Sequence, residues 1–142
     1  MSSALVDTGP LVAWFDKSDP DFRRARRFFA SFRERLVSTW PVLTEVSHLV
    51  PPYVSDRMLG WVGDGGVLLV DLPAESVPAM RQMRARYADN PMELADASLL
   101  WLADQLDLTE VITLDRGFSA FRTPSGRALR NLFPSRYMGL GK

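Results

Sequence analysis

The chain has 142 residues, of which 46% are hydrophobic and 24% are charged, and its 17 basic and 17 acidic side chains give a formal net charge of zero. This length and composition fit one globular domain with its own core, and they argue against a disordered chain or a generally basic protein that coats nucleic acid. The sequence contains no cysteine and one histidine, His48, which excludes disulfides, cysteine zinc sites and a multi-histidine metal site within one chain.

The apolar segments of the chain are short. The longest uninterrupted ones fall far below the roughly 18 residues that a membrane span requires. The N-terminal region has no basic segment, and Asp7 interrupts what could otherwise be the apolar core of a signal peptide. We therefore expect a soluble, unexported protein that is located in the cytoplasm and has no membrane partner.

The first half of the chain alternates between predicted strands and helices. Residues 3–6 form an apolar segment that ends at Asp7, and Thr8-Gly9-Pro10 and a second apolar segment follow. This pattern predicts a strand, a turn and a helix that is capped by Asp7 or Thr8 and has Pro10 in its first turn. The next elements are expected to be a helix at 19–34, a strand at 36–38 and helices at 41–50 and 53–62.

The second half continues this alternation. Residues 67–70 are almost continuously apolar, which is typical of a strand buried on both faces of a parallel sheet. Asn90-Pro91-Met92-Glu93 predicts the start of a helix with Asn90 as N-cap, Pro91 at the first position and Glu93 at the third. The other elements are expected to be a helix at 74–87, a strand at 111–114 and a short strand around 132–133, with the helix from Asn90 ending near 107. The alternation predicts one α/β domain, 1–142, with a mostly parallel sheet covered on both faces.

Two aspartates directly follow predicted strands. Asp7 comes after the strand at 3–6, and Asp115 comes after the strand at 111–114. In α/β sheets, ligands bind beyond the carboxyl ends of the strands, so these two carboxylates meet there if the two strands are neighbours. An aspartate after a strand also commonly caps the next helix or forms a turn, and this alternative stays open for both residues.

Two acidic residues lie on or near the apolar sides of predicted helices. Asp96 has Leu99, Leu100 and Ala103 three, four and seven positions later, which places its carboxylate on the apolar side. Burial of an unpaired charge costs several kcal/mol, so this position indicates either a function or a salt bridge. Glu45 also lies near an apolar face, and its alternative role is an ordinary pair with an arginine or with His48.

A group of carboxylates requires something to compensate their charge. Two ionised groups ~5 Å apart repel each other by about 3 kcal/mol at an effective dielectric constant near 20. A divalent cation relieves this repulsion, and oxygen ligands favour Mg²⁺ or Mn²⁺, which can activate water for the hydrolysis of a phosphodiester. The segment after Asp115 has six basic residues and no acidic one, so Arg116 and Arg122 are candidate ligands for the phosphates of a nucleic acid.

Four segments of the chain, in this order, resemble PIN-domain proteins and specifically VapC-type toxins. They are Leu5-Val6-Asp7-Thr8, Leu43-Thr44-Glu45-Val46, Leu94-Ala95-Asp96-Ala97-Ser98-Leu99 and Thr113-Leu114-Asp115-Arg116. The resemblance spans nearly the whole chain and implies a PIN-like three-layer sandwich with four or five strands. It also implies an Mg²⁺- or Mn²⁺-dependent endoribonuclease that forms a homodimer and is inhibited by a small VapB-type antitoxin.

The resemblance also assigns roles to single residues. It implies catalytic carboxylates at Asp7, Glu45, Asp96 and Asp115, of which the three aspartates are the metal ligands. Thr8 and Thr113 match polar positions that support such a site. Glu93 is interpreted mainly as a capping residue and only secondarily as a supporting residue of the site.

Three other interpretations fit less of the sequence. A phosphoacceptor enzyme of the haloacid dehalogenase type resembles Asp-x-Asp-x-Thr, whereas the residue two positions after Asp7 is Gly9. A receiver-like domain requires an acidic pair near the first strand and a late lysine, and the only late lysine is Lys142. A non-catalytic PIN-like module that binds RNA or protein stays as the main alternative, and it predicts that the carboxylates bind no metal.

Overall fold

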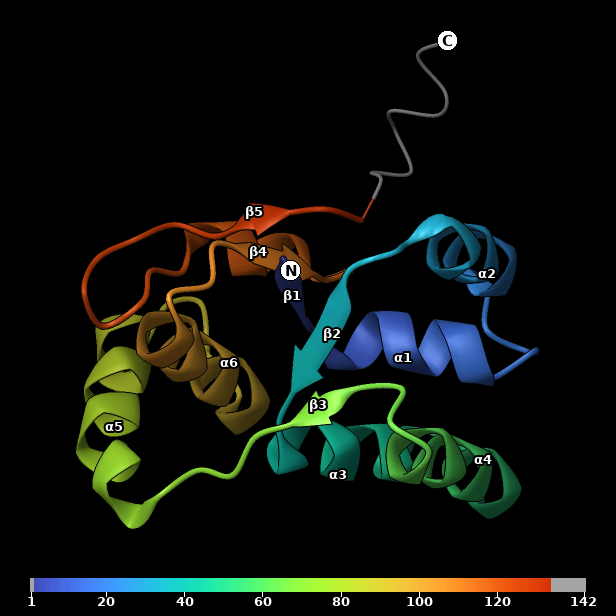
Figure 1. Ribbon diagram of the computed structural model, residues 1–142. Coiled ribbons are helices and arrows are strands. Elements are labelled where there is room, and N and C mark those ends of the chain that lie inside the picture. The colour runs from blue at the N-terminus through green and yellow to red at the C-terminus, as the bar shows by residue number, and fades with distance from the viewer. Residues whose placement is uncertain (1, 134–142) are drawn as a thin grey trace, which may run out of the picture.

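The structure is a computed structural model that describes residues 2–133, and it is built around one five-stranded sheet. The strand order is β3-β2-β1-β4-β5, and every neighbouring pair is parallel (Figure 1). The strands are β1 Ser3–Val6, β2 Arg35–Ser38, β3 Leu68–Leu69, β4 Glu110–Ile112 and β5 Arg130–Asn131. This arrangement confirms the predicted α/β fold with a parallel sheet, and it places β1 and β4 side by side.

Helices cover both faces of the sheet. The six α-helices are α1 Thr8–Phe15, α2 Phe22–Ser31, α3 Trp40–Leu49, α4 Pro52–Gly63, α5 Val77–Arg86 and α6 Leu94–Leu106. Figure 1 shows α1 and α2 to the right of the sheet and α5 and α6 to its left. Helix α3 packs against both α1 and α6, so it connects the two helical layers. Among residues 2–133, the structure contains no helix with the length and apolar character needed to cross a membrane.

The core lies between the sheet and these helices. Ala4, Leu5 and Val6 of β1 are fully buried, because β1 is the central strand and has a helical layer on each side. Between α1 and α2, the ring of Trp14 stacks on Phe29 with 4.2 Å between ring centroids. This burial fixes the position of β1, and with it the position of Asp7 directly after β1.

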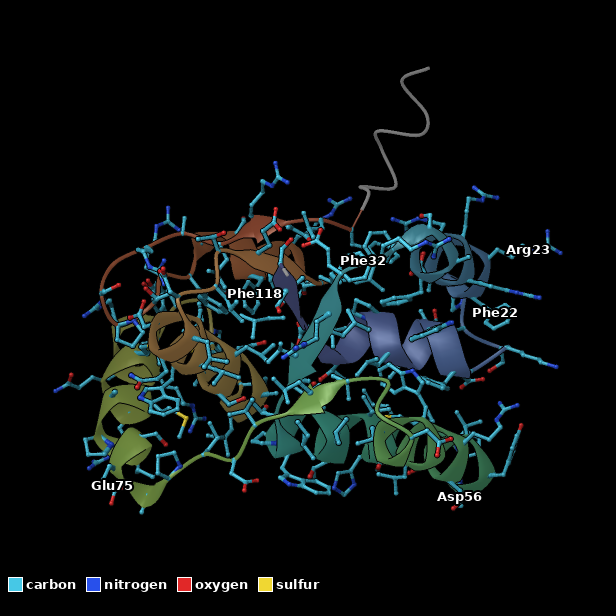
Figure 2. The ribbon with its side chains drawn as sticks, in the orientation of Figure 1. Phe22, Arg23, Phe32, Asp56, Glu75 and Phe118 are labelled. Carbon is cyan, nitrogen blue, oxygen red and sulfur yellow. The ribbon has the colours of Figure 1, made fainter. Side chains whose placement is uncertain are left out.

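Two short 3-10 helices complete the fold, η1 Ala74–Ser76 and η2 Arg116–Ala120. In Figure 2, Phe118 of η2 lies in the interior of the molecule, whereas Asp56 of α4 and Glu75 of η1 point outward. Phe118 is only 3% exposed, so its ring anchors η2 against the core. The predicted helix at 74–87 is thus divided between η1 and α5.

Three sequence predictions need correction. Residues 67–70 do not form a strand buried on both faces, because β3 contains two residues at the sheet edge and Leu68 is 41% exposed. The last strand is Arg130–Asn131 and not 132–133, although Leu132 N still donates to Val111 O at 2.8 Å. Of the basic residues after Asp115, Arg136 and Lys142 lie outside the described residues.

The third correction concerns the start of α6. This helix begins at Leu94, with Glu93 as N-cap and Asp96 at the third position, and not with Asn90 as N-cap. The Asp96 carboxylate accepts a hydrogen bond from Glu93 N at 3.1 Å and so takes the role that was predicted for Glu93. The Asn90 side chain instead donates to Gly117 O at 3.1 Å, which connects the segment before α6 to η2.

Candidate functional site

Asp7 lies at the carboxyl end of β1 and caps the N-terminus of α1. Its Oδ1 accepts a hydrogen bond from Thr8 N at 2.8 Å, and its Oδ2 accepts one from the Thr113 hydroxyl at 2.8 Å. Asp7 N donates to Ile112 O at 2.9 Å, so the backbone at this point is joined to β4. The Asp7 side chain is therefore held on both oxygens, and the residue is only 5% exposed.

Asp115 reaches the same end of the sheet from β4. The Thr113 hydroxyl that donates to Asp7 also accepts a hydrogen bond from Asp115 N at 3.0 Å, so one buried side chain connects the two aspartates. The Asp115 carboxylate caps η2 by accepting a hydrogen bond from Gly117 N at 2.9 Å. In contrast to Asp7, Asp115 is exposed to solvent.

Asp96 enters from the first turn of α6. Burial of this residue confirms the prediction from helical spacing, because only 6% of its surface is exposed. Among residues 2–133, neither Asp7 nor Asp96 belongs to an ion pair, so the salt bridge considered for Asp96 is not formed there. The N-terminal ends of α1 and α6 supply partial positive charge to Asp7 and Asp96, but no full countercharge.

The electrostatics connect all four predicted acidic residues. Burial raises the pKa of Asp7 to about 6, an effect opposed by the hydrogen bonds from Thr8 and Thr113 and increased by repulsion from Glu45 and Asp115. Burial and then repulsion from Asp7 raise the pKa of Asp96 to about 7, with smaller contributions from Asp115 and Glu45. These carboxylates come from α3, α6 and the ends of β1 and β4, so the fold brings them close enough to repel one another.

Glu45 lies at the edge of this carboxylate group, in a groove between α3 and α6. The groove has a volume of about 450 Å³, and its lining includes Trp40, Glu45, Glu93 and Leu94. A buried hydrogen bond of 2.7 Å between the Thr39 and Ser98 hydroxyls ties the start of α3 to α6. Glu93 therefore faces the groove beside Glu45, as well as capping α6.

A second groove lies beside Asp115, next to β4 and β5. It has a volume of about 400 Å³ and is lined in part by Thr113, Asp115, Arg116 and Ser119. Arg116 thus lies in a groove that adjoins the carboxylates. Arg122 does not line this groove, and its guanidinium donates to the carbonyl oxygens of Ser119 and Phe121 at 2.9 Å each.

The chemistry of the group suits a divalent cation. Four carboxylates that repel one another offer hard oxygen ligands, and Thr8 Oγ1 is a buried polar atom without a hydrogen-bond partner in the described residues. As the side chains stand in residues 2–133, no three acidic or histidine side chains are placed to hold one ion. Each of the three aspartates accepts a hydrogen bond from a backbone N–H of its own segment.

Two polar residues next to the site were not recognised as such from the sequence. Asn131 of β5 forms hydrogen bonds with both the N–H and the carbonyl of Thr113, at 3.1 and 3.0 Å. No local pattern indicates this contact, because it depends on the pairing of β4 with β5. Asn90 was assigned to the start of α6, and the nearby Pro91 and Glu93 made that assignment plausible, but its side chain contacts η2.

Comparison with known proteins agrees with the fold. The family model described as PIN domain matches residues 4–123. Ribonuclease VapC26 of Mycobacterium tuberculosis (strain ATCC 25618 / H37Rv) is 29% identical over 127 residues, which cover 86% of this chain and 94% of that protein. The crystal structure of Mycobacterium tuberculosis VapC20, a sarcin-ricin loop cleaving toxin, matches with a TM-score of 0.76 and 18% identity, covering 84% of this chain and 94% of that one. The chain belongs to the PIN domain family.

Proposed function

We propose that this protein is a divalent-metal-dependent endoribonuclease that hydrolyses RNA phosphodiesters, and that it is the toxin of a VapBC-type toxin–antitoxin pair. The observation that carries the proposal is the meeting of Asp7, Glu45, Asp96 and Asp115 at the carboxyl ends of β1 and β4. Ligands bind at this end of the strands in α/β sheets. The similarity to Ribonuclease VapC26 supports RNA as the substrate.

The four acidic residues have different environments and therefore different proposed roles. Asp7, Asp96 and Asp115 are the metal ligands, and Glu45, which is half-buried in its groove, acts at the edge of the site on the substrate or the attacking water. Thr113 fixes the orientation of Asp7 by its hydroxyl hydrogen bond, while Thr8 offers a buried hydroxyl in the same turn. A bound Mg²⁺ or Mn²⁺ supplies positive charge to the scissile phosphate and lowers the pKa of water at the site.

The groove next to Asp115 provides room for an RNA strand beside the carboxylates. Arg116 lines the groove next to Asp115, where a guanidinium can bind phosphate with two parallel hydrogen bonds. Arg122 is also proposed as a phosphate ligand, although its guanidinium already donates to two backbone carbonyls. Glu45 and Glu93 make the other groove acidic, so RNA phosphates are disfavoured there.

The partner proteins proposed here follow from the family. A toxin of this type acts on RNA in the cytoplasm and is inhibited by a VapB-type antitoxin. We also propose a homodimer, because Trp40 and Leu94 are 51% and 49% exposed and line the same groove. Exposed apolar surface of this kind marks interaction sites.

The test is RNA cleavage by the purified protein and by Asp96→Asn, prepared in the same way. This substitution keeps the size of the side chain and an oxygen that can accept the hydrogen bond from Glu93 N. A loss of activity is therefore expected to result from the missing negative charge and not from misfolding. Because one fold neighbour is a sarcin-ricin loop cleaving toxin, an oligonucleotide with that ribosomal loop is the first substrate, followed by total RNA. Mg²⁺ and Mn²⁺ are each added to metal-free protein.

The expected result is cleavage by the parent protein with either metal, a decrease of at least roughly 100-fold in the variant and growth arrest on expression of the parent only. Equal cleavage by both proteins indicates a contaminating nuclease and removes the support for the proposal. Metal-independent binding of RNA without cleavage favours the non-catalytic module instead.

A further inference from the structure

The sequence contains only two asparagines, Asn90 and Asn131, and both reach the turn that carries Asp115. We call residues 113–117 the Asp115 turn. Asn131 contacts its first residue, Thr113, and Asn90 contacts its last residue, Gly117. The two side chains come from segments 41 positions apart in the sequence, one before α6 and one in β5.

Asn131 acts on the backbone of Thr113. Its Oδ1 accepts hydrogen bonds from Thr113 N at 3.1 Å and from Phe133 N at 3.0 Å, and its Nδ2 donates to Thr113 O at 3.0 Å. The side-chain amide thus supplies one donor and one acceptor, as a neighbouring strand would, at the point where β4 has ended. The Thr113 hydroxyl connects Asp7 to Asp115, so Asn131 fixes the residue on which both aspartates depend.

Asn90 acts at the other end of the turn. Its Nδ2 donates to Gly117 O at 3.1 Å, while Gly117 N donates to the Asp115 carboxylate at 2.9 Å. A Cβ atom on Gly117 would lie 3.1 Å from Asn90 Oδ1 and 3.3 Å from Asp115 Oδ1. The glycine is therefore fitted closely between the two side chains, and a shift of Asn90 changes the N–H that holds Asp115.

We propose that Asn131 and Asn90 are positioning residues that hold the Asp115 turn from its two ends, and that Asn131 also orients Asp7 through Thr113. This inference rests on the proposed nuclease function, since it assigns the two amides to the geometry of the carboxylates. Asp115 and Arg116 are exposed, so burial does little to fix the middle of the turn, whereas Thr113 and Phe118 on either side of it are buried. Loss of a residue that hydrogen-bonds to a metal ligand commonly lowers metal affinity or activity by roughly 10- to 100-fold.

The test compares Asn131→Ala and Asn90→Ala with the parent protein. Asn131 is exposed, so its truncation removes hydrogen bonds without leaving a cavity. We expect kcat to fall by roughly 10- to 100-fold for Asn131→Ala and by about tenfold for Asn90→Ala. KM for RNA is expected to change less than kcat, because the Asn131 amide, although it lines the groove next to Asp115, is already hydrogen-bonded to the backbone of Thr113 and Phe133. The affinity for Mn²⁺, measured by calorimetry without RNA, is expected to weaken in parallel.

Two controls separate positioning from a general loss of stability. Ser125→Ala removes a 2.7 Å hydrogen bond to Asp104 in a surface loop outside the site. This variant is expected to lower Tm by about as much as the asparagine variants do, but to leave kcat and Mn²⁺ affinity unchanged. Asn131→Ala is also made in a Thr113→Val background, which lacks the bridging hydroxyl. Because Asn131 acts through this hydroxyl, its effect on kcat is expected to shrink in that background.

Parent levels of kcat and Mn²⁺ affinity in both asparagine variants would overturn the inference, as would full additivity with Thr113→Val. If the parent protein cleaves no RNA, the proposed function fails, while the Mn²⁺ titration still decides the positioning role. A parent protein that binds no Mn²⁺ overturns both.

Discussion

Burial of Asp7 and Asp96 makes their ionised forms costly to the folded protein. The pKa values are raised from 3.8 to about 6 for Asp7 and about 7 for Asp96, chiefly by desolvation. Between pH 4 and 7 the folded state therefore binds more protons than the unfolded state. The stability that this protonation contributes is fully present below pH 4 and is lost as the pH rises through 6 and 7.

This cost can be measured by removing one of the charges. In metal-free protein, we expect Asp96→Asn to raise the free energy of unfolding by roughly 1–3 kcal/mol at pH 7.5 and to have little effect at pH 4.5. Urea denaturation in EDTA across this pH range is the measurement, and other titrating groups cancel in the difference between the two proteins. A difference that does not change with pH would contradict the pKa assignment.

The site residues differ in how far the sequence could indicate them. Asp96 could be placed on a buried helix face because Leu99, Leu100 and Ala103 follow it at helical spacing, and its low exposure confirms this. Asp7 and Asp115 could be brought together because each follows a predicted strand and β1 and β4 are paired, although β4 ends at Ile112, three residues before Asp115. Asn131 could not be found in this way, since its contact with Thr113 depends on pairing between a three-residue strand and a two-residue strand.

At the level of elements, the site depends on how closely α1 approaches the segment after β4. A Cβ atom on Gly9 of α1 would lie 3.2 Å from Leu114 Cβ, directly before Asp115. An added methyl group therefore requires Leu114 or α1 to shift by a few tenths of an ångström. The packing therefore leaves little room for a side chain at position 9.

The matched experiment uses two helical glycines. We expect Gly9→Ala to destabilise the protein by about 1 kcal/mol, because overpacking outweighs the better helix propensity of alanine, and to reduce RNA cleavage. Gly60→Ala in α4 is expected to stabilise by about 0.5–1 kcal/mol, since nothing lies within 4 Å of its added Cβ. Urea denaturation checks both, and equal effects of the two substitutions would contradict the close approach of α1.

The helix and strand boundaries that were predicted wrongly are those that depend on contacts with other parts of the chain. The pattern from Asn90 to Glu93 fits a helix start, but the capping role of Asp96 and the contact of Asn90 with Gly117 move the start to Leu94. The apolar residues 67–70 fit a buried strand, but β3 ends the sheet and has a partner on one side only. The local sequence pattern thus predicted that a helix and a strand form here and in which order. Their exact ends and their burial depend on the tertiary contacts of α6 and on the edge position of β3.

For the whole molecule, the groove between α3 and α6 links the site to the proposed assembly. A two-fold interface brings the same patch of each copy together, and this suits the apolar side chains of Trp40 and Leu94, which are about half exposed. Trp40 and Leu94 stand at the N-terminal ends of α3 and α6, near Glu45. A dimer formed there would place two carboxylate sites close to each other and narrow the path by which RNA reaches them.

Helix α6 offers a matched pair of residues to test this assembly. Leu94 and Leu106 are 49% and 43% exposed and lie at opposite ends of the helix, 12 positions and thus about 18 Å apart. If the groove is the interface, Leu94→Ser raises the dissociation constant of the dimer by at least roughly tenfold, since each copy loses a buried leucine from the contact. Leu106→Ser removes the same side chain at the far end and leaves the constant at the parent value. Sedimentation equilibrium measures both, and a dimer that weakens equally in the two variants, or in neither, places the interface elsewhere.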